Sequence, residues 1–184
     1  MKKTNNLVMR IVAAVLVLPL IVDYTYYTVN IIIDRPKFAN TSMIAFYILD
    51  ILALIAVVVG AIIGKYAISL IGAMAYATIY LISILSQMGD FSYISAMMIA
   101  QCIPQLVMFT IMALLLGKMI KPLPAVVIVI AITILDLILD FVVRLSNHMR
   151  LLHWGNLRLL VTNLCYCAAI VLIILLIEKK TSEK

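Results

Sequence analysis

The chain has 184 residues, of which 66% are hydrophobic and 12% are charged, and its formal net charge is +6. Soluble domains carry about 25% charged residues, so this composition excludes a water-soluble globular protein. The basic residues are scattered over the ends of the apolar stretches instead of forming one patch, which argues against nucleic-acid binding. A mean hydropathy of +1.22 predicts an integral membrane protein surrounded by the lipid bilayer.

Six apolar stretches follow one another along the chain. Because a spanning helix needs about 20 mostly apolar residues, the sequence predicts an all-α, polytopic membrane bundle in a single domain over residues 1–184. The first stretch has lysines before it, like a signal peptide, but no small-residue cleavage site follows it, so we expect a retained helix. The expected spans are 7–29, 43–63, 66–87, 93–117, 123–145 and 157–177.

Charged residues, glycine and proline separate these stretches. Residues 34–37 carry three charges and a proline, and Pro122 begins the fifth span. The apolar run from Ile44 to Leu85 is too long for one helix across a hydrocarbon core of about 30 Å. We therefore expect a hairpin at Gly64 and Lys65.

The distribution of lysine and arginine predicts the orientation. With the N-terminus inside, the basic residues of the cytoplasmic segments outnumber those of the outer segments, so both termini are expected to be cytoplasmic. The excess of lysine over arginine and the short polar tail suit a bacterial plasma membrane. The inner set is Lys2, Lys3, Arg10, Lys65, Lys118, Lys121, Lys179, Lys180 and Lys184; the outer set is Arg35, Lys37, Arg144, Arg150 and Arg158.

The aspartates within the spans are all expected in the outer half of the membrane. Asp50 is about 10 Å from the outer end of its helix, at 1.5 Å per residue. Asp136, Asp140 and Arg144 recur every four residues, so they form one stripe on the fifth helix. A carboxylate that faces lipid costs several kcal/mol, so these side chains are expected to face the bundle interior.

Other polar residues are expected at the same membrane depths as these aspartates. Together they predict a polar pocket that opens outward and holds a small solute. The alternatives are that Asp23, Tyr24, Tyr26 and Tyr27 form an interfacial aromatic belt, and that the aspartates are buried in pairs between helices. The candidate ligand-binding residues are Asp50, Asp136, Asp140, Arg144, Arg158, Tyr76, Tyr80, Gln101, Gln105 and Asn163.

The inner half of the predicted bundle is apolar and contains small residues at a spacing of four. Such faces let helices approach closely, either within the bundle or against a partner membrane subunit. These residues are Gly60, Gly64, Ala73, Ala77, Ala96 and Ala100. Cys102, Cys165 and Cys167 are interpreted as small buried hydrophobes, and the spacing of His148 and His153 does not suit a metal site, so no cofactor or metal is expected.

No catalytic motif is present, and we expect a protein that is not an enzyme. The preferred hypothesis is a transport component that captures a small solute, with any energy supplied by another subunit. In size and helix number the chain is similar to the substrate-binding subunits of energy-coupling factor vitamin transporters. Their AxxxA motif is absent, because no alanine follows Ala13 or Ala14 four residues later. The alternative is a non-transporting accessory, scaffold or immunity-type membrane protein.

Overall fold

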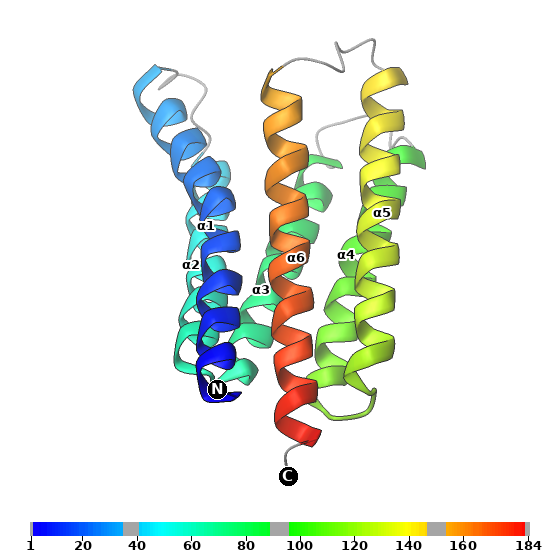
Figure 1. Cartoon of the computed structure of the whole chain (residues 1–184). Helices are drawn as coiled ribbons and strands as arrows, with labels where there is room; N and C mark the ends of the chain where they lie inside the picture. The colour runs from blue at the N-terminus through cyan, green and yellow to red at the C-terminus, as the bar shows by residue number, and fades with distance from the viewer. Residues whose placement is uncertain (1, 35–40, 89–95, 147–153, 183–184) are drawn as a thin grey trace.

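The computed structural model describes residues 2–34, 41–88, 96–146 and 154–182, and all four segments are helical. Figure 1 shows the helices lying side by side along one direction, with both chain ends at the same end of the bundle. The all-α prediction is confirmed. The helices are α1 (Lys2–Asp34), α2 (Thr41–Ile63), α3 (Tyr66–Met88), α4 (Ala96–Leu116), α5 (Pro122–Ser146) and α6 (Trp154–Ser182).

By length and composition, five helices contain an apolar stretch long enough to cross a membrane. These stretches are Asn6–Ile33, Ser42–Ile63, Tyr66–Ser86, Pro122–Leu139 and Leu160–Ser182. Within the described residues, α4 contributes a shorter apolar stretch, Cys102–Leu116. The chain is therefore a multi-pass membrane protein, with five long spans and a shorter apolar helix where the sequence predicted six spans of similar length.

The helices form a closed ring in which each packs against its neighbours in sequence and α6 returns to α1. A smaller contact between α3 and α6 crosses the ring, and it brings the two halves of the chain together at the centre. The core is aliphatic, with Leu54 on α2, Met112 on α4 and Ile173 on α6 fully buried. Val22, Ile33 and Val127 have exposed fractions of 63%, 68% and 64% on the outside, where lipid would solvate them.

Glycine and serine bring α2 and α3 into close contact. A Cβ atom at Gly72 would lie 2.7 Å from the backbone oxygen of Ala53, and one at Gly60 would lie 2.5 Å from the backbone nitrogen of Ser69. The buried Ser69 hydroxyl donates to the backbone oxygen of Val57 at 3.0 Å. The turn between these helices falls at Gly64 and Lys65, with Gly64 at a φ of 71°.

The predicted small-residue faces thus lie at internal helix contacts where the structure describes them. Gly60 is buried against α3, and Ala73 and Ala77 belong to the buried part of α3, at 0% and 1% exposure. Ala96 and Ala100 are in the first turns of α4, and their side chains lie outside the described part of the structure. Packing within one chain accounts for the described members of this set.

An arginine of α1 binds the C-terminal end of α2. Arg10 Nε donates to the backbone oxygen of Ala61 at 3.0 Å, and its Nη2 donates to that of Ile62. These oxygens belong to the last turn of α2, where carbonyl groups lack partners within the helix. The guanidinium supplies both donors and a positive charge at the negative end of the helix dipole.

The α2–α3 contact predicts the effect of one added methyl group. We expect Gly72→Ala to lower the free energy of unfolding by about 2 kcal/mol, because overpacking against rigid backbone costs more than the helix propensity of alanine recovers. Denaturation in mixed detergent micelles measures this. Gly117→Ala is the matched control: its nearest neighbour would lie 3.4 Å away, an ordinary contact. Equal effects of the two substitutions would contradict the close approach.

Candidate functional site

A carboxyl group is buried near the middle of α2. Asp50 lies on α2 and is 2% exposed. Its Oδ1 atom is buried and has no hydrogen-bond partner. A carboxylate is expensive to bury without donors, and within a membrane protein such a residue is a candidate functional site. The question is therefore which groups surround it.

Tyrosines from four helices occupy this region, and together with Asp50 we call them the Asp50–tyrosine cluster. Tyr76 makes most of the contacts within this cluster. Its hydroxyl is hydrogen-bonded to that of Tyr24 at 3.0 Å. Its ring lies 5.1 Å from the ring of Tyr166 and 6.3 Å from that of Tyr80, measured between centroids. Tyr47 joins through Tyr24, with 5.7 Å between ring centroids. The rings come from α1 (Tyr24), α2 (Tyr47), α3 (Tyr76 and Tyr80) and α6 (Tyr166).

Asp50 lies close enough to Tyr24, Tyr47, Tyr76 and Tyr166 for its charge to interact with their hydroxyl groups. The Tyr166 hydroxyl oxygen is also buried and has no hydrogen-bond partner. A negative oxygen beside several aromatic rings attracts a positively charged group, through charge and through the negative faces of the rings. The arrangement therefore suits an organic cation more than an anion.

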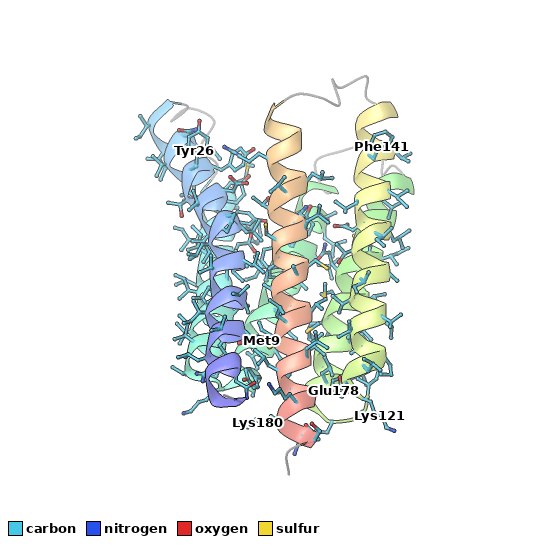
Figure 2. All side chains as sticks on the ribbon, in the orientation of Figure 1. Met9, Tyr26, Lys121, Phe141, Glu178 and Lys180 are labelled. Carbon is cyan, nitrogen blue, oxygen red and sulfur yellow. The ribbon has the colours of Figure 1, made fainter. Side chains whose placement is uncertain are left out.

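A second buried acid, Asp23, is already paired. Its Oδ1 atom lies 2.9 Å from Arg158 Nε, and this ion pair joins α1 to α6. The guanidinium also lies over two exposed rings of α1, at 5.0 Å from the Tyr26 centroid and 5.3 Å from the Tyr27 centroid. Figure 2 labels Tyr26 near the end of the bundle opposite to the chain termini. The Asp23–Arg158 ion pair links two helices and balances the charge of Asp23, while the second carboxyl oxygen, Oδ2, is buried without a hydrogen-bond partner.

The structure distributes the residues of the predicted pocket over several places. Tyr76 and Tyr80 lie with Asp50 in the Asp50–tyrosine cluster, whereas Arg158 binds Asp23. Three residues are half-buried on other helices: Gln105 on α4, Asp136 on α5 and Asn163 on α6. Asp136 has an interaction of its own. The side chains of Gln101, Asp140 and Arg144 lie outside the described part of the structure, as do His148 and His153.

Three tyrosines of the cluster were not among the candidate residues, although the sequence contains signals for two of them. Tyr47 precedes Asp50 by three residues, which places both on one face of α2. Tyr166 lies three residues after Asn163 on the polar face of α6. Tyr24 belongs to a group of nearby tyrosines whose pattern also suits an interfacial aromatic belt. Tyr26 and Tyr27 are exposed, as such a belt requires. Tyr24 instead points into the bundle, where its hydroxyl is hydrogen-bonded to that of Tyr76.

A cavity of about 680 Å³ lies at the opposite end of the bundle. It is bordered by the α2–α3 turn, the α4–α5 turn and the end of α6, at residues such as Lys65, Lys118 and Lys180. Figure 2 places Lys121 and Lys180 at the same end as the chain termini. The sequence predicts that the half of the bundle containing this cavity is apolar and closely packed. In that interpretation the lysines only indicate the orientation in the membrane.

Among the described residues, no group of three or more His, Cys, Asp or Glu side chains could hold a metal ion. The cluster therefore consists of one carboxyl group, phenol hydroxyls and aromatic faces. Comparison of the chain with protein-family models, with curated proteins and with solved structures finds no match.

Proposed function

We propose that the protein is a membrane transport component that binds a small organic cation at the Asp50–tyrosine cluster. The observation that carries the proposal is the buried Oδ1 of Asp50, which lacks a donor and lies beside a group of five tyrosine rings in mutual contact. A bound ammonium group would supply the missing positive charge and donors. The proposal assigns no chemical step to the protein, because the cluster has the properties of a binding site.

The chemistry of the cluster favours an amine or a quaternary ammonium over other solutes. Aromatic faces attract a cation by about 0.5–2 kcal/mol each, and most strongly when water is excluded. The carboxylate adds a charge that a neutral solute would not compensate. An anion would meet the same negative oxygen and ring faces, and would be repelled.

The Asp50–tyrosine cluster is buried within a multi-pass bundle, which favours capture and transport of a ligand over binding at the protein surface. Asp50 and Tyr76 are 2% and 7% exposed, so a ligand reaches them only when helices move apart. The central contact of α3 with α6, where Tyr76 meets Tyr166, is much smaller than the contacts between neighbouring helices of the ring, and such a separation would occur there. A partner subunit would supply the energy for directed movement.

The alternative is a non-transporting accessory or scaffold protein. The Asp23–Arg158 pair favours it, because the charge of that acid is neutralised by a residue of another helix, as in a purely structural bundle. The two functions differ at Asp50: a scaffold keeps Asp50 for packing, whereas a transport component keeps it for the ligand.

The test is binding of choline to the purified full-length protein in phosphatidylcholine nanodiscs, followed by calorimetry. The reference ligand is 3,3-dimethyl-1-butanol, which has the shape of choline with carbon in place of the charged nitrogen. We expect choline to bind more tightly than this neutral analogue. Asp50→Asn should weaken choline binding at least tenfold, which corresponds to about 1.4 kcal/mol.

Glu178→Gln is the control, because it also removes one carboxylate but lies in the last turns of α6, whereas Tyr166 is near the middle of that helix. Figure 2 shows Glu178 near the end of the bundle with the chain termini. Its choline affinity should equal that of the wild type. Ethanolamine and putrescine extend the probes to primary amines. If no probe binds better than the neutral analogue, or if Asp50→Asn binds as the wild type does, the cluster is structural and the scaffold function is favoured.

A further inference from the structure

The cavity between the α2–α3 turn, the α4–α5 turn and α6, here called the inner basic cavity, brings together lysines from three parts of the chain. Lys65, Lys118, Lys121 and Lys180 all line it. Among the described residues of its lining, none is acidic. Four ammonium groups around one cavity repel one another, so the arrangement is stable only with an anion or solvent between them.

Two helix ends add to this positive potential. Tyr66 and Ala67 of the first turn of α3 and Pro122 of the first turn of α5 line the inner basic cavity. The first turn of a helix carries a partial positive charge, which favours anions. Lys180 is held over the Tyr66 ring, with its Nζ 5.6 Å from the ring centroid. Lysines and helix dipoles therefore act in the same direction.

The backbone at Lys118 is unusual. It has a φ of 57°, in the left-handed region where glycine is normally found. Lys118 N donates to Leu115 O at 3.1 Å and Met119 N donates to Leu114 O at 2.8 Å, which is the Schellman pattern that ends a helix. A lysine at this position carries a steric cost that glycine would avoid, and it places a basic residue on the lining of the cavity.

The rest of the lining is apolar. Leu70 and Leu115 belong to the buried core, and Ile177 packs against it. At about 680 Å³, the cavity exceeds what a lone phosphate ion would fill and lies within the range of small-molecule sites. Basic groups beside apolar walls match a ligand whose phosphate is attached to an apolar body. A phospholipid has this composition, and basic pockets between membrane helices bind such headgroups.

We propose that the inner basic cavity binds a phosphate-bearing anion, and that this anion is the headgroup of an acidic phospholipid of the adjoining leaflet. Lys65, Lys118, Lys121 and Lys180 compensate the phosphate charge, and the apolar walls contact the glycerol and the first acyl carbons. The site is separate from the Asp50–tyrosine cluster, and its test does not depend on any solute bound there.

The experiment uses the purified full-length protein in detergent, titrated with dioctanoyl phosphatidylglycerol and followed by native mass spectrometry. Lys180→Gln and Lys179→Gln form a matched pair of neighbours on α6, because each removes one charge but only Lys180 lines the cavity. We expect Lys180→Gln to weaken phosphatidylglycerol binding about fivefold, as one lysine near a headgroup contributes. Lys179→Gln should change it less than twofold.

Lys118→Gly separates binding from stability. It removes both the charge and the steric cost of the left-handed backbone. We expect its thermal unfolding midpoint to rise while its phosphatidylglycerol affinity falls about fivefold. A purely structural lysine would not produce opposite changes in the two measurements.

Two further ligands identify the source of the phosphate. Dioctanoyl phosphatidylcholine, which is zwitterionic, should bind more weakly than phosphatidylglycerol if charge is recognised. Glycerol 3-phosphate should compete poorly if the lipid is the ligand, and equally well if a soluble phosphate compound is. The proposal is overturned if phosphatidylcholine and phosphatidylglycerol bind alike and glycerol 3-phosphate does not bind, or if Lys180→Gln and Lys179→Gln bind alike.

Discussion

Arg158→Met is expected to lower the free energy of unfolding by about 3 kcal/mol, because it leaves a buried carboxylate without its counter-charge. The Asp23 side chain is only 9% exposed, so solvent cannot replace the guanidinium. The estimate is at the lower end of the range for buried pairs, since the Arg158 side chain is 31% exposed. Methionine keeps the length and apolar character of the side chain, and denaturation in mixed micelles measures the loss.

The reverse substitution should be milder. Asp23→Asn leaves Arg158 free to remain over the rings of Tyr26 and Tyr27, so we expect a loss of about 1 kcal/mol. The double variant Asp23→Asn/Arg158→Met removes both charges and should be more stable than Arg158→Met alone. Additive losses in this cycle would show that the two residues do not interact.

Asp50→Asn is expected to have the opposite sign and to raise the free energy of unfolding by about 2 kcal/mol. The carboxyl group of Asp50, one oxygen of which is buried without a partner, is replaced by an amide of the same shape that carries no charge and therefore costs less to bury. A residue retained for binding at the expense of stability behaves in this way. The measurement is the same micelle denaturation, without added ligand.

This prediction gives a second distinction between the two candidate functions. If Asp50 is a packing partner in a scaffold, its replacement removes a favourable contact and the protein becomes less stable. Glu178→Gln provides the reference for removing a carboxylate elsewhere, and it should leave stability within about 0.5 kcal/mol of the wild type. A destabilised Asp50→Asn protein would contradict the assignment of Asp50 to a ligand.

The sequence predicts the helical membrane architecture well, because a long apolar stretch has few alternatives to a helix in lipid. It also singles out Asp50, since an acid deep in an apolar stretch is conspicuous. The groups around Asp50 are harder to predict. Tyr24 and Tyr166 reach it from helices at opposite ends of the chain, and only the packing of α1 and α6 in the ring brings them near α2 and α3.

Two features were beyond prediction from sequence patterns for a related reason. Asp23 and the following tyrosines resemble an interfacial belt, and only the contact of α1 with α6 reveals that Asp23 binds Arg158. The inner basic cavity likewise depends on three separate turns and helix ends meeting. Lys65, Lys118 and Lys180 are distant in sequence, so each by itself indicates only which side of the membrane it occupies.

The contact of Arg10 with the end of α2 bears on how the protein is assembled. Translation delivers α1 before α2 and α3, so the arginine is already present when the hairpin leaves the ribosome. The carbonyl groups of Ala61 and Ile62 then find donors as soon as the hairpin arrives. A chain that starts after α1 would leave the Ile62 carbonyl without this side-chain donor during insertion.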